Sequence, residues 1–183
     1  MSSVNCQNML FCCIILYLIY NYFCNSIAFI MSTSEQTKLA RALLRSAALR
    51  ATAVRVTILA SLLKSGCPLS HNDLWRSKRI RAFNRVTVYR TLLTLQKHGI
   101  AHAVQGTDGL WRYCAHDLSR GGCPGNHPHF VCTRCRRMIC LLDQTMPFVR
   151  VPKGTMVKAK QFVVYGTCAA CRAGCGAASG AEP

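Results

Sequence analysis

The stretch NRVTVYRTLLTLQKHGIAHAVQGTDGLWRYC, residues 84–114, decides the fold of the first half of this chain. Its opening part carries an apolar stripe with spacings of four and three residues, at Val88, Leu92 and Leu95. Asn84 can cap this helix and Gly99 can end it. After Gly99 the pattern alternates as IAHAVQ and LWRYC around GTDG, which predicts a β-hairpin. The stretch therefore predicts a helix followed by a two-stranded ribbon.

Three further helices are predicted upstream. The first, from about residue 37, has an apolar face of Leu39, Leu43, Leu44, Ala47 and Ala48. The second can be capped by Thr52 and can end at Ser65-Gly66, and its stripe is Val54, Ile58, Leu59, Leu62 and Leu63. The third is SHNDLWRSKR from Ser70, with Leu74 and Trp75 inward and Arg76, Lys78, Arg79 and Arg81 outward. Helices followed by a ribbon make a winged helix-turn-helix, whose last helix enters the major groove of DNA.

The charge of the chain favours a nucleic-acid partner. Its 183 residues carry 23 Lys and Arg against 6 Asp and Glu, which gives a formal net charge of +17. Such a charge attracts polyanions, with DNA as the first candidate and an anionic membrane as the second. Residues of the last helix that could contact DNA are Arg85, Thr87, Tyr89 and Arg90. The alternative is a basic surface that serves only solubility, with Tyr89 and Arg90 as ordinary surface residues.

Two C-x-x-C pairs, Cys132 with Cys135 and Cys168 with Cys171, predict a structural zinc site. The chain has 13 cysteines and no convincing export signal, so metal binding is favoured over disulfides. Unrelated thiol pairs are one alternative; a redox pair would need a helix start beside a parallel sheet. The flanking sequence predicts a small α/β unit with strands near 129–131, 137–142 and 161–166. A poorly helical stretch with Pro147 and Pro152 joins them.

A second set of metal ligands lies where the two halves of the chain should meet. Its members are His102 on the first wing strand, Cys114 at the end of the second, and His127 and His129 before the first C-x-x-C pair. Three imidazoles and one thiolate suit tetrahedral zinc better than ferrous iron. A metal there would shift the two halves toward one arrangement. In the alternative, His102 is a polar wing residue and Cys114 a buried apolar one.

The N-terminal segment, residues 1–30, contains no Asp, Glu, Lys or Arg. The apolar run over 9–31 is about long enough to span a bilayer, although Asn21, Asn25 and Ser26 interrupt it. We interpret the segment as an extension before a start at Met31, with a membrane anchor as the alternative. Both interpretations place the working part in the cytoplasm, and membrane association is expected only if residues 9–31 are retained.

Five motifs between residues 31 and 172 resemble the ferric uptake regulator family, and most of all its zinc-responsive members. They are R-A-T-A-V-R (50–55), S-H-N-D-L (70–74), T-V-Y-R (87–90), H-P-H-F-V-C-T-R-C (127–135) and Y-G-T-C-A-A-C (165–171). The resemblance implies a winged helix, a dimerisation domain with structural zinc, a regulatory metal site in the hinge, and homodimers on palindromic operators. It also implies repression when metal is plentiful.

The resemblance assigns roles to individual residues. The structural zinc positions match Cys132, Cys135, Cys168 and Cys171, and the regulatory positions match His102, Cys114, His127 and His129. Iron-responsive relatives have Glu at the position of Cys114, so this residue favours zinc. Tyr89 and Arg90 match the recognition helix, and the R-A-T-A-V-R motif adds Arg50 and Arg55 as DNA-binding candidates.

The chain departs from the family in several places. Cys140 stands where relatives commonly have an acidic ligand, so it is a possible further thiolate ligand or a spare thiol. The insert before the histidines is long and contains Cys123. Asn126 and Pro128 replace residues of a further metal site, which we predict to be absent. Pro147 and Pro152 disfavour the usual dimerisation helix.

The sequence therefore predicts an α+β protein. Its parts are the hydrophobic segment 1–30, a winged-helix DNA-binding domain 31–116, a hinge insert 117–126, a zinc-binding α/β dimerisation domain 127–172 and a flexible tail 173–183. The expected function is zinc-responsive repression of metal uptake genes, with structural and regulatory zinc. An iron-responsive or thiol- and peroxide-sensing regulator of the same fold is the alternative. No small-molecule substrate and no enzymatic activity are expected, because no carboxylate pair supports acid–base chemistry.

Overall fold

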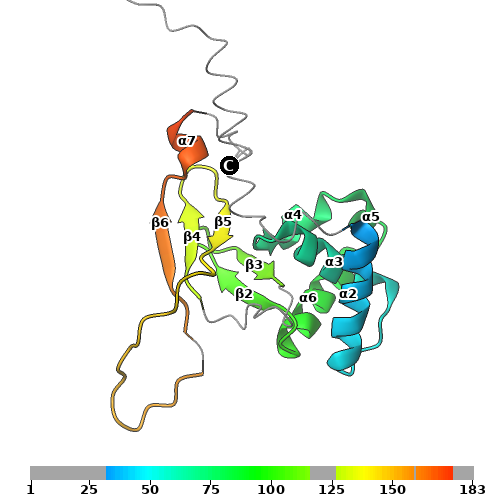
Figure 1. Cartoon of the computed structure of the whole chain (residues 1–183), viewed down its shortest axis with the longest axis horizontal. Helices are drawn as coiled ribbons and strands as arrows, with labels where there is room; N and C mark the ends of the chain where they lie inside the picture. The colour runs from blue at the N-terminus through cyan, green and yellow to red at the C-terminus, as the bar shows by residue number, and fades with distance from the viewer. Residues whose placement is uncertain (1–31, 116–126, 159, 175–183) are drawn as a thin grey trace, which may run out of the picture.

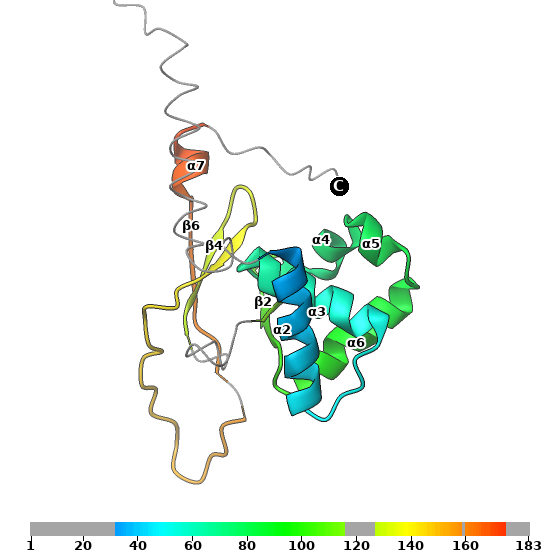
Figure 2. The same ribbon diagram turned by 45° about the vertical axis from the view of Figure 1, so that its right-hand side comes forward.

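The computed structural model describes residues 32–115, 127–158 and 160–174. The helices between residues 33 and 97 form one unit, and a three-stranded sheet with a short helix at its end, between residues 129 and 172, forms a second (Figure 1). A two-stranded hairpin extends from the helices to that sheet (Figures 1 and 2). The α+β class is confirmed, and the predicted N-terminal run 1–30 lies outside the described residues.

The first helix, α2 (Thr33–Ser46), begins at a capping box made by Ser32 and Glu35. The prediction that Ala47 and Ala48 continue this helix is wrong. Ala48 has a positive φ of 54°, and its N–H donates to the carbonyl of Arg45 at 3.0 Å. The chain therefore turns away from the helix axis at Ala48, two residues after the helix ends.

The second helix, α3 (Ala53–Ser65), ends at Gly66, as predicted. Gly66 adopts the left-handed conformation with φ of 61°, which glycine reaches without steric cost. Thr52 occupies the N-cap position, but its side chain makes no cap hydrogen bond. The apolar stripe of this helix is buried at Val56, Ile58, Leu59, Leu62 and Leu63.

The third predicted helix is two short helices, α4 (His71–Trp75) and α5 (Lys78–Arg81). Ser77 between them has an extended backbone, which interrupts the helical hydrogen bonds. Leu74 is buried as expected, whereas Trp75 is only half-buried. A short strand that was not predicted, β1 (Leu69–Ser70), precedes α4.

The predicted last helix is confirmed as α6 (Arg85–Lys97), with the Asn84 side chain accepting from the Val86 N–H at 2.8 Å. Its buried face packs against α3 and α4 in the main core, which includes Val88, Leu92 and Leu95. The predicted hairpin is also present, as β2 (His102–Gln105) and β3 (Trp111–Cys114). With β1 these strands form an antiparallel sheet in the order β1-β3-β2, which completes a winged helix.

The second sheet has the order β5-β4-β6. Strand β4 (His129–Cys132) is antiparallel to β5 (Met138–Cys140) and parallel to β6 (Val163–Gly166). The three predicted strands are thus confirmed; β5 and β6 are shorter than predicted, and β4 is one residue longer. A short helix, α7 (Ala169–Arg172), follows β6. The described residues between β5 and β6 form neither helix nor strand, consistent with Pro147 and Pro152.

The hairpin packs against the second sheet through its first strand. Val104 of β2 is buried together with Val131, Met138 and the half-buried Val163 of the second sheet. The backbone of Gln105 and the side-chain amide of Gln161 exchange two hydrogen bonds, at 2.8 and 3.3 Å. These contacts hold His102, at the start of β2, beside β4.

None of the helices in the described part of the chain is sufficiently long and apolar to span a membrane.

Candidate metal centres and nucleic-acid interface

The four-cysteine cluster brings together the two C-x-x-C pairs. Ligand atoms of Cys132, Cys135, Cys168 and Cys171 all lie within 4.8 Å of one another. The first pair lies on the turn between β4 and β5, and the second lies at the start of α7. Cys135 Sγ and Cys168 Sγ are 3.8 Å apart. Zinc–sulfur bonds of about 2.3 Å in a tetrahedron separate two sulfurs by about 3.8 Å, so this donor set fits zinc.

Backbone N–H groups favour the ionised form of one of these sulfurs, and this is the form that binds a cation. Burial opposes ionisation of Cys132, but backbone N–H groups point at its sulfur and lower the pKa of this thiol to about 6. Two of these donors are Cys168 at 3.4 Å and Cys135 at 3.5 Å. Burial and the neighbouring thiols instead raise the pKa of Cys171 to about 12. One sulfur is therefore already a thiolate at neutral pH, while Cys171 retains its proton until a cation replaces it.

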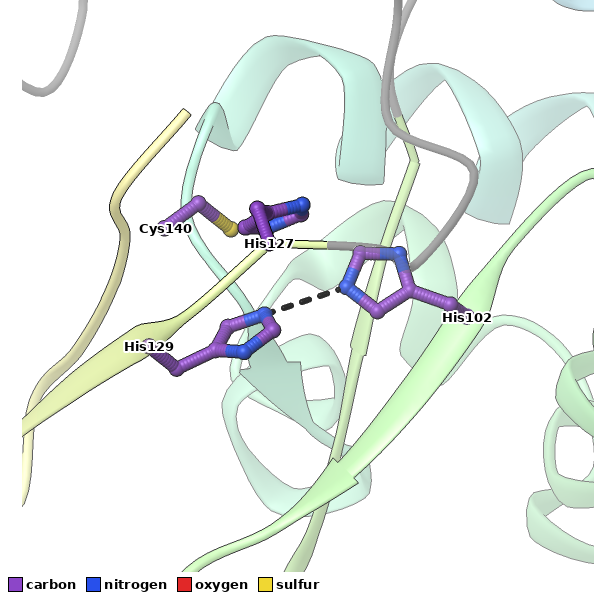
Figure 3. A group of neighbouring side chains, drawn as sticks. All are labelled: His102, His127, His129 and Cys140. Atoms are coloured by element: carbon purple, nitrogen blue, oxygen red, sulfur yellow. Dashed lines mark hydrogen bonds between the residues drawn. The ribbon is translucent and has the colours of Figure 1, made fainter. Parts of the chain in front are cut away.

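The hinge cluster, His102, His127, His129 and Cys140, is the second group of candidate ligands (Figure 3). Its ligand atoms also lie within 4.8 Å of one another. The pairing of the strands explains why these side chains come together, because directly opposed residues of antiparallel strands lie on the same face of the sheet. His102 is opposite Cys114 in the wing, and His129 is opposite Cys140 in the second sheet. Each sheet thus presents one histidine and one cysteine to the other.

The imidazoles of the hinge cluster are close enough to share an ion. His102 Nε2 and His129 Nε2 are 3.2 Å apart, as the dashed line in Figure 3 shows. Zinc–nitrogen bonds of about 2.0 to 2.1 Å in a tetrahedron give a nitrogen–nitrogen distance of about 3.3 to 3.4 Å. The rings of His127 and His129 have centroids 4.5 Å apart, and both side chains are buried. The alternate positions 127 and 129 thus place both imidazoles on the same side of the chain.

One nitrogen of the hinge cluster lacks a hydrogen bond. Across the residues that the structure describes, His129 Nδ1 is the buried side-chain polar atom with no partner. Burying an unsatisfied polar atom costs free energy, and histidine nitrogens are preferred zinc ligands. Burial also lowers the pKa of His102, and the charges of His129 and His127 act in the same direction, whereas the interaction of His102 with Cys140 opposes this shift. This direction favours the neutral form of His102, which is the form that binds metal.

Cys114 differs from its predicted place among the hinge donors. It is not a member of the mutual group of ligand atoms, in which the one thiol is Cys140. Cys114 is fully buried behind this group, and its Sγ lies 3.5 Å from Cys140 Sγ. The sequence analysis named Cys140 only as a possible ligand, because the pairing of β4 with β5 that brings it to His129 is not visible in a motif. The available signal for Cys140 in the sequence was its position, at which relatives commonly have an acidic residue.

The predicted DNA-contacting residues lie on the outer face of α6. Arg85, Thr87, Tyr89 and Arg90 are exposed, while Val88 between them is buried. Tyr89 lies in an edge-on contact with His71, with ring centroids 6.4 Å apart. This part of the surface also carries exposed cations on α5, at Lys78, Arg79 and Arg81.

Two of the predicted DNA-contacting side chains are held by neighbouring groups. Arg85 donates to the Asn72 side chain at 2.8 Å and lies over the Trp75 ring, 5.7 Å from its centroid. Arg55 is half-buried and donates to the carbonyl of Arg50 at 3.0 Å, while the Arg50 side chain is exposed. These contacts orient Arg85 and Arg55 before any partner binds. Cys123 and Asn126 in the predicted hinge insert, and Cys175 in the tail, lie outside the described residues.

The comparisons with known proteins agree with this architecture. A zinc uptake regulator complexed with zinc and DNA has a TM-score of 0.55 to this chain at 20% identity, covering 78% of this chain and 96% of that chain. The Helicobacter pylori ferric uptake regulator, whose structure reveals three functional metal binding sites, has a TM-score of 0.51 at 16% identity, with coverage of 78% and 95%. A zinc-bound manganese uptake regulator has a TM-score of 0.50 at 19% identity, with coverage of 71% and 98%. These likenesses concern the fold.

No curated protein matches the chain. The sequence profile described as the ferric uptake regulator family matches residues 46–152, which is more than half of the chain. This match covers the winged helix from α3 onward, the hinge histidines and the first C-x-x-C pair. The chain therefore belongs to the ferric uptake regulator family, whose members are metal-responsive transcription regulators and not enzymes.

Proposed function

We propose that this protein is a zinc-responsive repressor that binds palindromic operator DNA as a metal-loaded homodimer in the cytoplasm and controls metal uptake genes. The observation that carries the proposal is the hinge cluster, which takes His102 from the wing and its other members from the second domain. The proposed division is a DNA-binding domain over 31–116 and a dimerisation domain over 127–172.

The composition of the hinge cluster supports zinc as the sensed metal. Three imidazoles and a thiolate match the ligands that zinc takes in tetrahedral sites. Ferrous iron and manganese bind harder oxygen ligands, and the mutual group contains no carboxylate. The similarity to a zinc uptake regulator complexed with zinc and DNA supports the same choice. We propose the four-cysteine cluster as a structural zinc site that stays loaded.

The location of the hinge cluster supports a switch. A bound zinc ion would contribute its binding free energy only while β2 lies against β4 and β5. His102 and Val104 are neighbours on β2, so the metal and the apolar contact favour the same arrangement. The wing and α6 share one core, and fixing the wing therefore restricts the direction in which α6 faces.

The exposed face of α6 supports DNA reading. We propose that Tyr89, Arg90 and Thr87 contact base edges, and that Arg85, Arg50 and Arg55 hold phosphates. Dimerisation is supported by the exposed apolar residues of the second domain, such as Val164 and Tyr165 on the edge strand β6. Sedimentation of the zinc-loaded protein tests this part, and a monomer at all concentrations would contradict it.

The proposal is tested by titrating metal into the protein while fluorescence anisotropy reports binding to a selected palindromic DNA. We expect tight binding with about two zinc ions per chain and weak binding with one, because only the second ion joins the two domains. Iron(II) and manganese(II) should not replace zinc at equal concentration. Equal affinity at both zinc loadings would refute the switch.

A matched pair of histidine variants sharpens this titration. His102→Ala should lose the response to the second zinc ion. His98→Ala should keep it, because His98 lies at the exposed end of α6 and bonds only within that turn, to the Thr94 carbonyl at 2.9 Å. In both variants binding should weaken steeply with salt, since phosphate contacts release counterions.

A further inference from the structure

The two cysteines that face each other across the hinge carry an inference beyond metal binding. We propose that Cys114 and Cys140 form an oxidative modification site, in which peroxide converts them to a reversible disulfide that links the wing to the second sheet. The chemistry of this site does not depend on which metal the hinge binds. Its regulatory consequence, loss of the metal response, rests on the proposed function.

The distance between the two sulfurs supports the formation of a disulfide. The two sulfurs are 3.5 Å apart, and a disulfide bond of about 2.05 Å requires them to approach by about 1.5 Å. Each cysteine ends a strand, Cys114 ending β3 and Cys140 ending β5. Strand ends can absorb such a movement without breaking the sheet registers that precede them. The bond would connect two domains that otherwise meet through the wing contacts.

Burial sets the order of the reaction. Cys140 is half-buried, whereas Cys114 is fully buried, so peroxide reaches Cys140 first. The Cys140 sulfur forms a bond to one peroxide oxygen, the oxygen–oxygen bond breaks, and one water leaves with a sulfenic acid remaining. The Cys114 sulfur then attacks the Cys140 sulfur, the sulfur–oxygen bond breaks, and a second water leaves. Two thiols and one hydrogen peroxide thus give one disulfide and two waters, and a thiol reductant reverses the change.

The disulfide and the hinge metal compete for the same sulfur. Cys140 is a member of the hinge cluster, and a disulfide sulfur is no longer a thiolate ligand. Zinc should therefore protect the pair from peroxide, and oxidation should prevent zinc from binding at the hinge. The four-cysteine cluster provides an internal comparison, since Cys135 and Cys168 are 3.8 Å apart but belong to a closed set of four sulfurs.

The sequence allows a direct test by mass spectrometry. Trypsin releases Cys114 in YCAHDLSR (113–120) and Cys140 in MICLLDQTMPFVR (138–150), each with a single cysteine. The full chain, carrying only its tightly held zinc, is treated with a small excess of hydrogen peroxide, alkylated and digested without reductant. We expect the linked pair of these two peptides to be the main new disulfide and to disappear on reduction. Saturating zinc before peroxide should lower its yield by about tenfold or more, because coordinated sulfur is shielded.

Variants separate this pair from other thiols. Cys140→Ser and Cys114→Ser should each eliminate the linked peptides, and Cys123→Ser, the matched control in the insert, should leave their yield unchanged. A link from Cys114 to the Cys123 peptide, or overoxidised Cys140 with no link, would overturn the proposal. Zinc binding by the unoxidised protein is measured in parallel. If the protein binds zinc at the hinge but yields no linked peptides, only this inference is contradicted. If it yields linked peptides but binds no zinc at the hinge, only the proposed function is contradicted.

Discussion

The four-cysteine cluster and the hinge cluster differ in what they connect. The first takes all its ligands from the second domain, at two turns of one small sheet and its short helix. The second takes His102 from the wing and its other three members from the second domain. A metal in the first therefore stabilises a local fold, whereas a metal in the second stabilises an arrangement of domains. Similar ligand chemistry thus serves a constitutive role in one place and a conditional role in the other.

Removing one structural sulfur should produce the largest effect. Cys132→Ser should unfold the second domain, because structural zinc sites contribute apparent binding free energies of about 10 to 16 kcal/mol. Hydrogen exchange of residues 129–140 and the zinc content of the protein measure this loss. Cys140→Ser is the control and should retain both the protected sheet and one zinc ion. A protected second sheet in Cys132→Ser would remove the distinction between the clusters.

The two hinge cysteines should differ in their effect on metal affinity. Cys140→Ser should weaken hinge zinc binding on the order of a hundredfold, which exceeds the usual cost of losing a supporting group. Cys114→Ser should weaken it less, because Cys114 lies outside the mutual group of ligand atoms. Chelator competition gives the affinities, and the sulfur-to-metal absorption of a cobalt(II) substitute counts the thiolates. A larger loss for Cys114→Ser would show that Cys114 is the ligand, as the sequence analysis assigned it.

Acid should loosen the hinge. Burial lowers the pKa of His102 from the ordinary value of 6.5, so separated domains bind a proton that the closed hinge excludes. The contribution of His102 is fully present above pH 6.5 and is lost as the pH falls toward the lower pKa of the closed state. Hydrogen exchange of β2 in protein without hinge metal measures this loosening. His102→Asn should flatten the profile, and an unchanged profile would assign the effect to other groups.

The smallest effect should come from the polar contact beside the hinge. Gln161→Ala removes two exposed hydrogen bonds to the backbone of Gln105, each worth about 1 kcal/mol or less. Zinc-dependent DNA affinity should therefore change by less than about thirtyfold. A loss as large as that of His102→Ala would mean that ordinary domain contacts, and not the metal donors, set the arrangement.

Much of the fold was predictable because its signals are local. The stripe of Val88, Leu92 and Leu95 predicts α6, and the alternation after Gly99 predicts the wing. The errors fall where neighbouring structure overrides local preference. Ala48 leaves its helix through a left-handed turn, and Ser77 divides the third predicted helix in two. Strand β1 was missed because Leu69 and Ser70 become a strand only through pairing with β3.

In the candidate metal centres, too, local features were predictable from the sequence and nonlocal ones were not. The C-x-x-C spacing predicted the grouping of the four cysteines, because each turn aims two sulfurs in one direction whatever surrounds it. The meeting of His102 with His127 and His129 was also predicted, from their places at the domain boundary. The choice between Cys114 and Cys140 was not predictable, because it depends on two strand registers and on how the two sheets face each other.

By itself, the sequence determined the winged helix, the strands of the second domain and the cysteine turns, since periodicity and short ligand spacing act within a few residues. Only the tertiary structure decided which sulfur joins the hinge histidines and which lies behind it at 3.5 Å. That decision is nonlocal, because a shift of one residue in either register would turn a cysteine to the opposite face of its sheet.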